Sequence, residues 1–136
     1  MRRSRPILLL VTAALLTSAV AAPASAAPDS PVTFTILHTN DFHGQLEWKS
    51  GGSSSNPGSG RVAAHVNSVR AAVGEANTIL VDAGDEMQGS LLSNLQQGVP
   101  TIATYNEMDY AVATFGNHEF DWGKTVLADR VGEANY

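Results

Sequence analysis

The chain has 136 residues, of which 43% are hydrophobic and 15% charged, and this composition is typical of globular rather than disordered proteins. It contains no cysteine, which excludes disulfide bonds, thiolate metal ligands and a cysteine nucleophile. The formal net charge of −5 disfavours binding to duplex nucleic acid, which depends on neutralisation of phosphates by Lys and Arg. Any metal must therefore be bound by nitrogen and oxygen, and a phosphate substrate would need positive charge from that metal.

The first 26 residues have the three parts of a secretory signal peptide. Three arginines lie within the first five residues, an apolar run follows from 7 to 22, and positions 24–26 are Ala-Ser-Ala. The apolar run is shorter than the roughly 20 residues that a membrane-spanning helix needs. We therefore expect export, cleavage after Ala26 and no stable membrane insertion afterwards. Cleavage would remove three of the eight basic residues and none of the thirteen acidic ones, which leaves a net charge of −8.

The first predicted strand runs from Val32 to Leu37, because β-branched and aromatic residues are concentrated there, and it ends at His38. A polar segment at 39–44 closes on glycine, as expected of a loop that leaves a buried strand. Residues 49–60 are rich in Gly, Ser, Asn and Pro, which predicts a flexible surface loop rather than a domain linker.

The next two predicted elements are a helix and a strand. Apolar residues recur at intervals of three and four over 61–73, which predicts an amphipathic helix. The continuous apolar run from Thr78 to Val81 then predicts a strand buried on both faces. The polar sequence Asp-Ala-Gly-Asp at 82–85 follows it.

The rest of the chain continues the alternation. A helical stretch is predicted at 91–95, a helix from Pro100 to Met108, a strand from Ala111 to Phe115 and a helical segment at 125–131. Strands that alternate with helices predict an α/β layered architecture.

Polar residues follow each of the three predicted strands, and the carboxyl ends of parallel strands lie at one edge of a sheet. Their oxygen and imidazole donors suit divalent zinc, manganese, iron or cobalt. Two such ions about 3.5–4 Å apart repel each other, and a carboxylate between them, for which Asp85 is the candidate, reduces that repulsion. Asp and Asn after strands also form turns and helix caps, so each residue alone indicates little. The residues at the three strand ends are Asp41 with His43, Asp85, and Asn117 with His118.

Three sequence blocks resemble the calcineurin-like metallophosphoesterases: Ile-Leu-His-Thr-Asn-Asp-Phe-His-Gly at 36–44, Asp-Ala-Gly-Asp at 82–85, and Gly-Asn-His-Glu-Phe-Asp at 116–121. The additional Gln-Gly-Ser at 88–90 and Phe-Asp-Trp-Gly at 120–123 are similar to the secreted 5′-nucleotidase branch. The resemblance covers most of residues 32–123. It implies the N-terminal half of that family's α/β sandwich.

The resemblance also implies roles for the site residues and two divalent metal ions, which could be zinc, manganese, cobalt, iron or magnesium. Asp41 and His43 would bind the first ion, Asp85 would bridge, and Asn117 would bind the second. His118 and Asp121 would form a catalytic dyad beside the substrate phosphate. The three-residue spacing of the dyad independently allows Asp121 to fix the tautomer of His118 or to raise its pKa.

Several histidines and glutamates stay without an assigned role. His38 and His65 are expected to be packing or surface residues. Glu86 and Glu119 could orient metal ligands or could equally face solvent.

By the same resemblance, residues 27–136 are the N-terminal part of the catalytic domain. Further metal ligands and a nucleoside-recognising domain would come from sequence downstream, so this piece alone is expected to be inactive. The implied function is hydrolysis of nucleoside 5′-monophosphates by a water activated at a dinuclear metal site.

Two alternatives remain at this point. One is the same metal core acting on other substrates, which are cyclic nucleotides, nucleotide sugars, sulfur-linked esters or other phosphoesters. The other is a short secreted protein that binds a metal or a nucleotide without catalysis.

Overall fold

A computed structural model gives the fold and describes residues 30–50 and 56–136. The predicted signal peptide lies outside the described residues, of which Val32–Tyr136 form one compact unit. None of the described helices is long and apolar enough to span a membrane.

The predicted α/β class is confirmed. In chain order the elements are β1 (Thr35–Thr39), α1 (Gly58–Val73), the short 3₁₀ helix η1 (Glu75–Asn77), β2 (Thr78–Asp82), α2 (Leu91–Asn94), α3 (Val99–Glu107), β3 (Val112–Ala113), the 3₁₀ helix η2 (His118–Phe120) and α4 (Gly123–Glu133).

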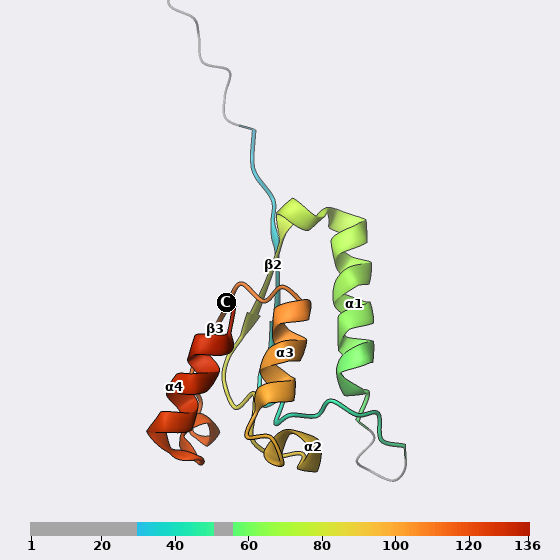
Figure 1. Ribbon diagram of the computed structural model, residues 1–136. Helices are drawn as coiled ribbons and strands as arrows, with labels where there is room; N and C mark the ends of the chain where they lie inside the picture. Colours follow the sequence, from blue (N-terminus) through green and yellow to red (C-terminus); the bar gives the residue numbers. More distant parts are fainter. Residues whose placement is uncertain (1–29, 51–55) are drawn as a thin grey trace, which may run out of the picture. The chain divides into compact units, whose positions relative to one another are not determined.

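The described strands form one parallel sheet in the order β1-β2-β3. β1 begins three residues later than predicted, because Thr35 pairs with Thr78, the first residue of β2, and the chain before Thr78 is the 3₁₀ helix η1. β3 is shorter than predicted because it pairs only with the last two residues of β2, Val81 and Asp82. All three strands point the same way, so their carboxyl ends share one edge of the sheet (Figure 1).

The ends of the helices follow from local hydrogen bonds. α1 begins three residues earlier than predicted, because the side chain of Asn56 accepts a hydrogen bond of 2.8 Å from the amide of Gly58. The helix ends at Val73, because the φ of 95° at the following Gly74 lies outside the range of a right-handed helix. At the start of α2 the hydroxyl of Ser90 accepts from the amide of Ser93.

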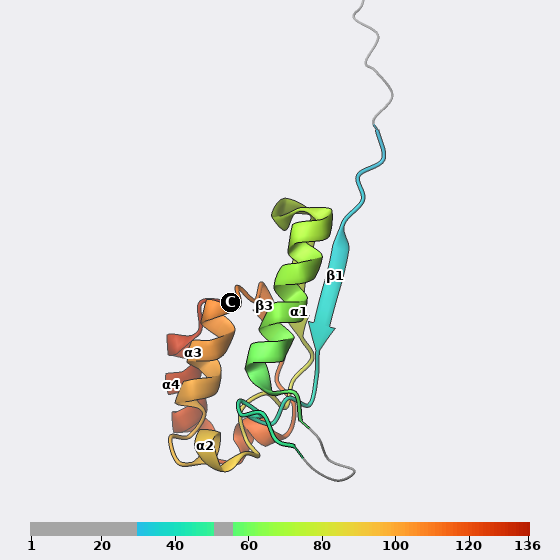
Figure 2. The same ribbon diagram turned by 90° about the vertical axis from the view of Figure 1, so that its right-hand side faces the viewer.

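The helices α1 and α3 pack against one face of the sheet, as Figures 1 and 2 show. Leu80 of β2 is only 1% exposed and lies at the centre of this face. Tyr105 and Tyr110 stack with their ring centroids 4.0 Å apart beneath the strands. The main core cluster consists of Val66, Leu80, Tyr105, Met108 and Tyr110.

The opposite face of the sheet is open in the part of the chain that the structure describes. Ile36, Ile79 and Val112 are 58%, 40% and 54% exposed. The prediction that the strand at 78–81 is buried on both faces is therefore wrong for the described residues. Successive side chains of a strand point to opposite faces, so β2 places Leu80 among the helices and Ile79 on the uncovered side.

This asymmetry gives a stability prediction for the 136-residue chain. Leu80→Ala should lower the free energy of unfolding by about 2–5 kcal/mol, because it leaves a cavity in a filled core. Ile79→Ala is the matched control from the same strand and should cost much less. Urea unfolding followed by circular dichroism measures both. Equal losses would mean that the second face is also covered.

Candidate metal centre

Backbone hydrogen bonds hold the loops after β1 and β2 side by side beyond the ends of the strands. The amide of Asp41 donates to the carbonyl of Gly84 over 3.0 Å, and the amide of His43 donates to the carbonyl of Asp85 over 2.9 Å. The amide of Gly44 donates in the same way to the carbonyl of Glu86 over 2.8 Å. The first two sequence blocks are thereby fixed in one arrangement.

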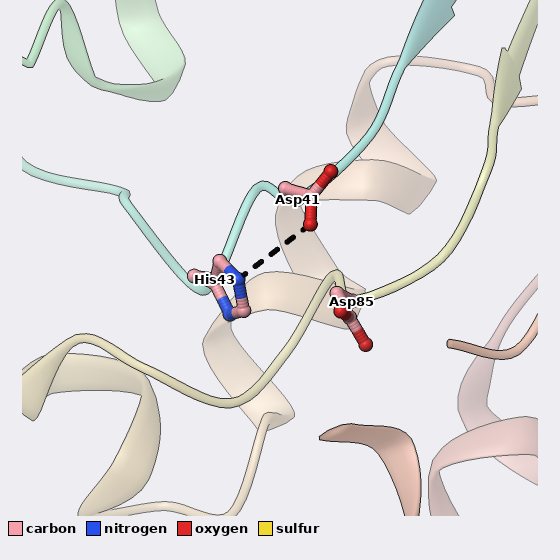
Figure 3. Close-up of side chains that lie close together, drawn as sticks. All are labelled: Asp41, His43 and Asp85. Carbon is pink, nitrogen blue, oxygen red and sulfur yellow. Dashed lines mark ion pairs between the residues drawn. The ribbon is translucent and has the colours of Figure 1, made fainter. Parts of the chain in front are cut away.

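This arrangement brings Asp41, His43 and Asp85 together (Figure 3). One ligand atom from each of the three side chains lies within 4.8 Å of the others. His43 Nε2 is 3.9 Å from Asp41 Oδ1. Asp41 is exposed and the other two are half-buried, so the cluster is accessible from solvent.

All three residues of the cluster have a left-handed backbone conformation. The φ angles of Asp41, His43 and Asp85 are 51°, 51° and 56°. Such a conformation costs a residue other than glycine on the order of 1–3 kcal/mol and persists only where the surroundings impose it. Three such residues at one point of the sheet edge mark it as a candidate functional site.

The imidazole of His43 is oriented by the Gln-Gly-Ser block. His43 Nδ1 lies 2.8 Å from the carbonyl oxygen of Gln88, which can only accept, so Nδ1 carries the proton. Nε2 is then left with a free lone pair toward the cluster. The same block also holds the backbone, since the amide of Ser90 donates to the carbonyl of His43 over 2.8 Å. The role of Gln88 was not predictable from the sequence, because a backbone carbonyl has no residue signature.

The third block lies beside the cluster. The amide of His118 donates to Asp85 Oδ1 over 2.9 Å, and the rings of His118 and His43 have centroids 5.1 Å apart. Asn117 precedes the 3₁₀ helix η2 and is exposed to solvent. The loops after the three strands therefore meet at this edge of the sheet, as predicted, whereas a contribution of Asn117 to the site stays a prediction.

His118 and Asp121 form the predicted pair, with His118 Nδ1 2.7 Å from Asp121 Oδ2. This hydrogen bond raises the pKa of His118 above its usual value. The negative charges of Asp121, Asp85 and Glu119 act in the same direction, and partial desolvation opposes them. The imidazolium form is thus favoured at this position.

The hydrogen bond gives a direct prediction for the metal-free protein. Asp121→Asn should lower the pKa of His118, because the amide stabilises an imidazolium less than a carboxylate does. Titration of the His118 ring protons by NMR measures this shift. Asp129→Asn, a substitution of an exposed aspartate on α4, is the control and should leave the pKa of His118 in place. An unchanged pKa in Asp121→Asn would contradict the assigned cause.

The two glutamates with an open role are both buried, so their exposure to solvent is excluded. Glu86 accepts a hydrogen bond of 3.1 Å from the Tyr136 hydroxyl. Burial, with a further contribution from the charge of Asp82, raises the pKa of Glu86 to about 8. Within residues 30–50 and 56–136, Glu119 accepts hydrogen bonds from three backbone amides. His38 and His65 are exposed, in agreement with a surface position.

The calcineurin-like phosphoesterase family matches residues 34–132, a range that includes all three polar loops. The chain belongs to this family. Members of the calcineurin-like phosphoesterase family use divalent metal ions. The donor set of Asp41, His43 and Asp85 fits such an ion, because it combines two carboxylates with an imidazole nitrogen whose orientation is fixed.

Among relatives of this chain, the trifunctional nucleotide phosphoesterase protein YfkN of Bacillus subtilis is 38% identical over 107 residues, which are 75% of this chain and 6% of the relative. The 5′-nucleotidase of Bos taurus is 38% identical over 106 residues, or 73% of this chain and 18% of the relative. The solved structure of a 5′-nucleotidase precursor from Thermus thermophilus has a TM-score of 0.65 at 34% identity, covering 74% of this chain and 20% of that one. The chain thus spans about a fifth or less of these relatives' length.

Proposed function

We propose that this chain forms part of an exported metal-dependent phosphoesterase that hydrolyses nucleoside 5′-monophosphates. The observation that carries the proposal is the Asp41–His43–Asp85 cluster, whose ligand atoms lie within 4.8 Å of one another at the carboxyl edge of the sheet. Relatives named as 5′-nucleotidases support the choice of nucleotide substrates.

In this proposal the metal centre is dinuclear. Asp41 and His43 would hold the first ion, Asp85 would be shared between the two ions, and Asn117 would contribute to the second together with further ligands. When bound, divalent ions supply the positive charge that this acidic chain lacks, and they polarise phosphate and activate water.

The chain's own residues then have distinct tasks. His43 presents Nε2 because Gln88 holds its Nδ1 proton. Asp85 keeps the three loops together, since its carbonyl and its carboxylate accept from the amides of His43 and His118. His118, held by Asp121, would donate a proton to the leaving oxygen or stabilise charge on the phosphate.

The test is phosphate release from AMP by the purified full-length protein. The metal-free protein, prepared with a chelator, should be inactive, and manganese, zinc or cobalt should restore activity. Inosine and adenosine 5′-monophosphates should be better substrates than adenosine 3′-monophosphate. Absence of phosphate release from every nucleotide with every metal would refute the proposal.

A second substrate class is favoured by one relative, which is named a 2′,3′-cyclic-nucleotide 2′-phosphodiesterase/3′-nucleotidase. The same metal core would then also act on cyclic nucleotides or other nucleotide phosphoesters. A panel with 2′,3′-cyclic AMP, nucleotide sugars and AMP, compared by kcat/KM, separates the two candidates.

Export is proposed from the sequence of residues 1–26. The arginine-rich start, the apolar run and the Ala-Ser-Ala site predict cleavage after Ala26. N-terminal sequencing of the protein recovered from the culture medium or cell envelope should begin at Ala27. Retention of Met1 in the cytosol would refute export.

A further inference from the structure

Glu119 is a buried acid at the carboxyl edge of the sheet, and it is 1% exposed. None of the ion pairs found among residues 30–50 and 56–136 includes it. Burial of a carboxylate is costly unless hydrogen bonds replace the lost water. Glu119 therefore needs strong donors, and the structure supplies three of them.

The donors are backbone amides from two different loops. Oε2 of Glu119 accepts from the amide of Asp85 over 2.9 Å and from the amide of Gly116 over 2.6 Å. Oε1 accepts from the amide of Glu86 over 2.9 Å. One side chain thus joins the loop after β2 to the turn after β3.

A hydrogen bond also runs from the loop after β3 to Asp85, since Asp85 Oδ1 accepts from the amide of His118 over 2.9 Å. The two carboxylates and the amides of 85, 86, 116 and 118 form a reciprocal arrangement that we call the carboxylate clasp. Its parts fit closely, because a Cβ at Gly116 would collide with the Asp85 carboxylate. The clasp therefore sets the distance between the two loops.

The clasp also acts on the backbone of Asp85, whose left-handed φ of 56° requires external support. The amide of Asp85 and the amide of the next residue, Glu86, flank the Asp85 α-carbon. Both amides donate to Glu119. We propose that Glu119 is a positioning residue, which holds Asp85 in its ligand orientation and fixes it against the loop that carries Asn117 and His118.

The test compares Glu119→Gln with Glu107→Gln in the full-length protein. Glutamine has nearly the shape of glutamate, but its NH₂ group cannot accept, so at least one clasp amide loses its partner. Glu107 is an exposed glutamate on α3 and serves as the matched control. The readouts are the Kd for Mn²⁺ by titration calorimetry, kcat and KM for AMP at saturating Mn²⁺, and the Tm without metal.

We expect Glu119→Gln to raise the Kd for Mn²⁺ by about 10- to 100-fold and to lower kcat by a similar factor, with KM little changed. Glu107→Gln should match the wild type. A lower Tm together with wild-type Mn²⁺ affinity and wild-type kcat would overturn the proposal, because Glu119 would then contribute only to folding.

A second variant keeps the test decisive if Glu119→Gln does not fold. Gly116→Ala keeps Glu119 but brings a Cβ against both the carboxylate and the amide of Asp85, so it disturbs the clasp from the loop after β3 and should also weaken Mn²⁺ binding. Wild-type affinity in this variant would overturn the proposal.

The kinetic readout rests on the proposed function, whereas Mn²⁺ binding does not. If the wild type binds Mn²⁺ but hydrolyses no nucleotide, the proposed function fails and the Mn²⁺ titrations still decide the role of Glu119. If the wild type hydrolyses AMP and all variants bind Mn²⁺ equally, only the role of Glu119 fails.

Discussion

Asp85→Asn in the full-length protein is expected to abolish phosphoester hydrolysis and to reduce the bound metal. Asp85 is the one member of the cluster whose carboxylate also accepts from the third loop, through the amide of His118. Asparagine keeps the size of the side chain but removes the negative charge that would offset two neighbouring cations. We expect kcat to fall by about 10³-fold or more, the upper range for loss of one electrostatic stabiliser.

Asp109→Asn is the matched control for this substitution. Asp109 also has a left-handed backbone, with φ of 53°, and it is exposed at the end of α3. A loss caused by the change from Asp to Asn in a left-handed turn would therefore appear in both variants. Metal content by mass spectrometry and turnover of AMP are measured for each. Wild-type turnover and metal content in Asp85→Asn would remove Asp85 from the mechanism.

The order and type of the elements were predictable from the sequence because their cues are local. The apolar run at 78–81 and the periodicity at 61–73 both correspond to observed elements, β2 and α1. The strand ends were less predictable, since they depend on partners. β1 begins at Thr35 because Thr35 pairs with Thr78, the first residue of β2. The β-branched residues before Thr35 do not show where this pairing starts.

The convergence of the candidate ligands was predictable for a topological reason, because parallel strands deliver their following loops to one edge. The hydrogen bonds that hold those ligands in position were not predictable from the sequence. Glu119 binds amides of Asp85 and Glu86, more than thirty positions earlier in the chain, and amides are present at every such position. The left-handed φ of His43 was equally hidden, because no glycine marks it.

His118→Ala in the full-length protein is expected to lower kcat for AMP by about 10²- to 10⁴-fold, the range for loss of a general acid or base. The imidazole is held by Asp121 over 2.7 Å, and its raised pKa favours the protonated form. It lies beside the cluster, with its ring centroid 5.1 Å from that of His43. His65→Ala, a substitution of an exposed histidine on α1, is the control and should retain wild-type turnover.

The choice of leaving group separates two roles for His118. An alkoxide such as the 5′-oxygen of a nucleoside leaves with difficulty unless it is protonated, whereas 4-nitrophenolate is stable without a proton. If His118 donates that proton, His118→Ala should lose much more activity on AMP than on 4-nitrophenyl phosphate. Equal losses on the two substrates would instead assign His118 to stabilisation of charge on the phosphate. Unchanged turnover of both would show that the His118–Asp121 pair takes no part in the reaction.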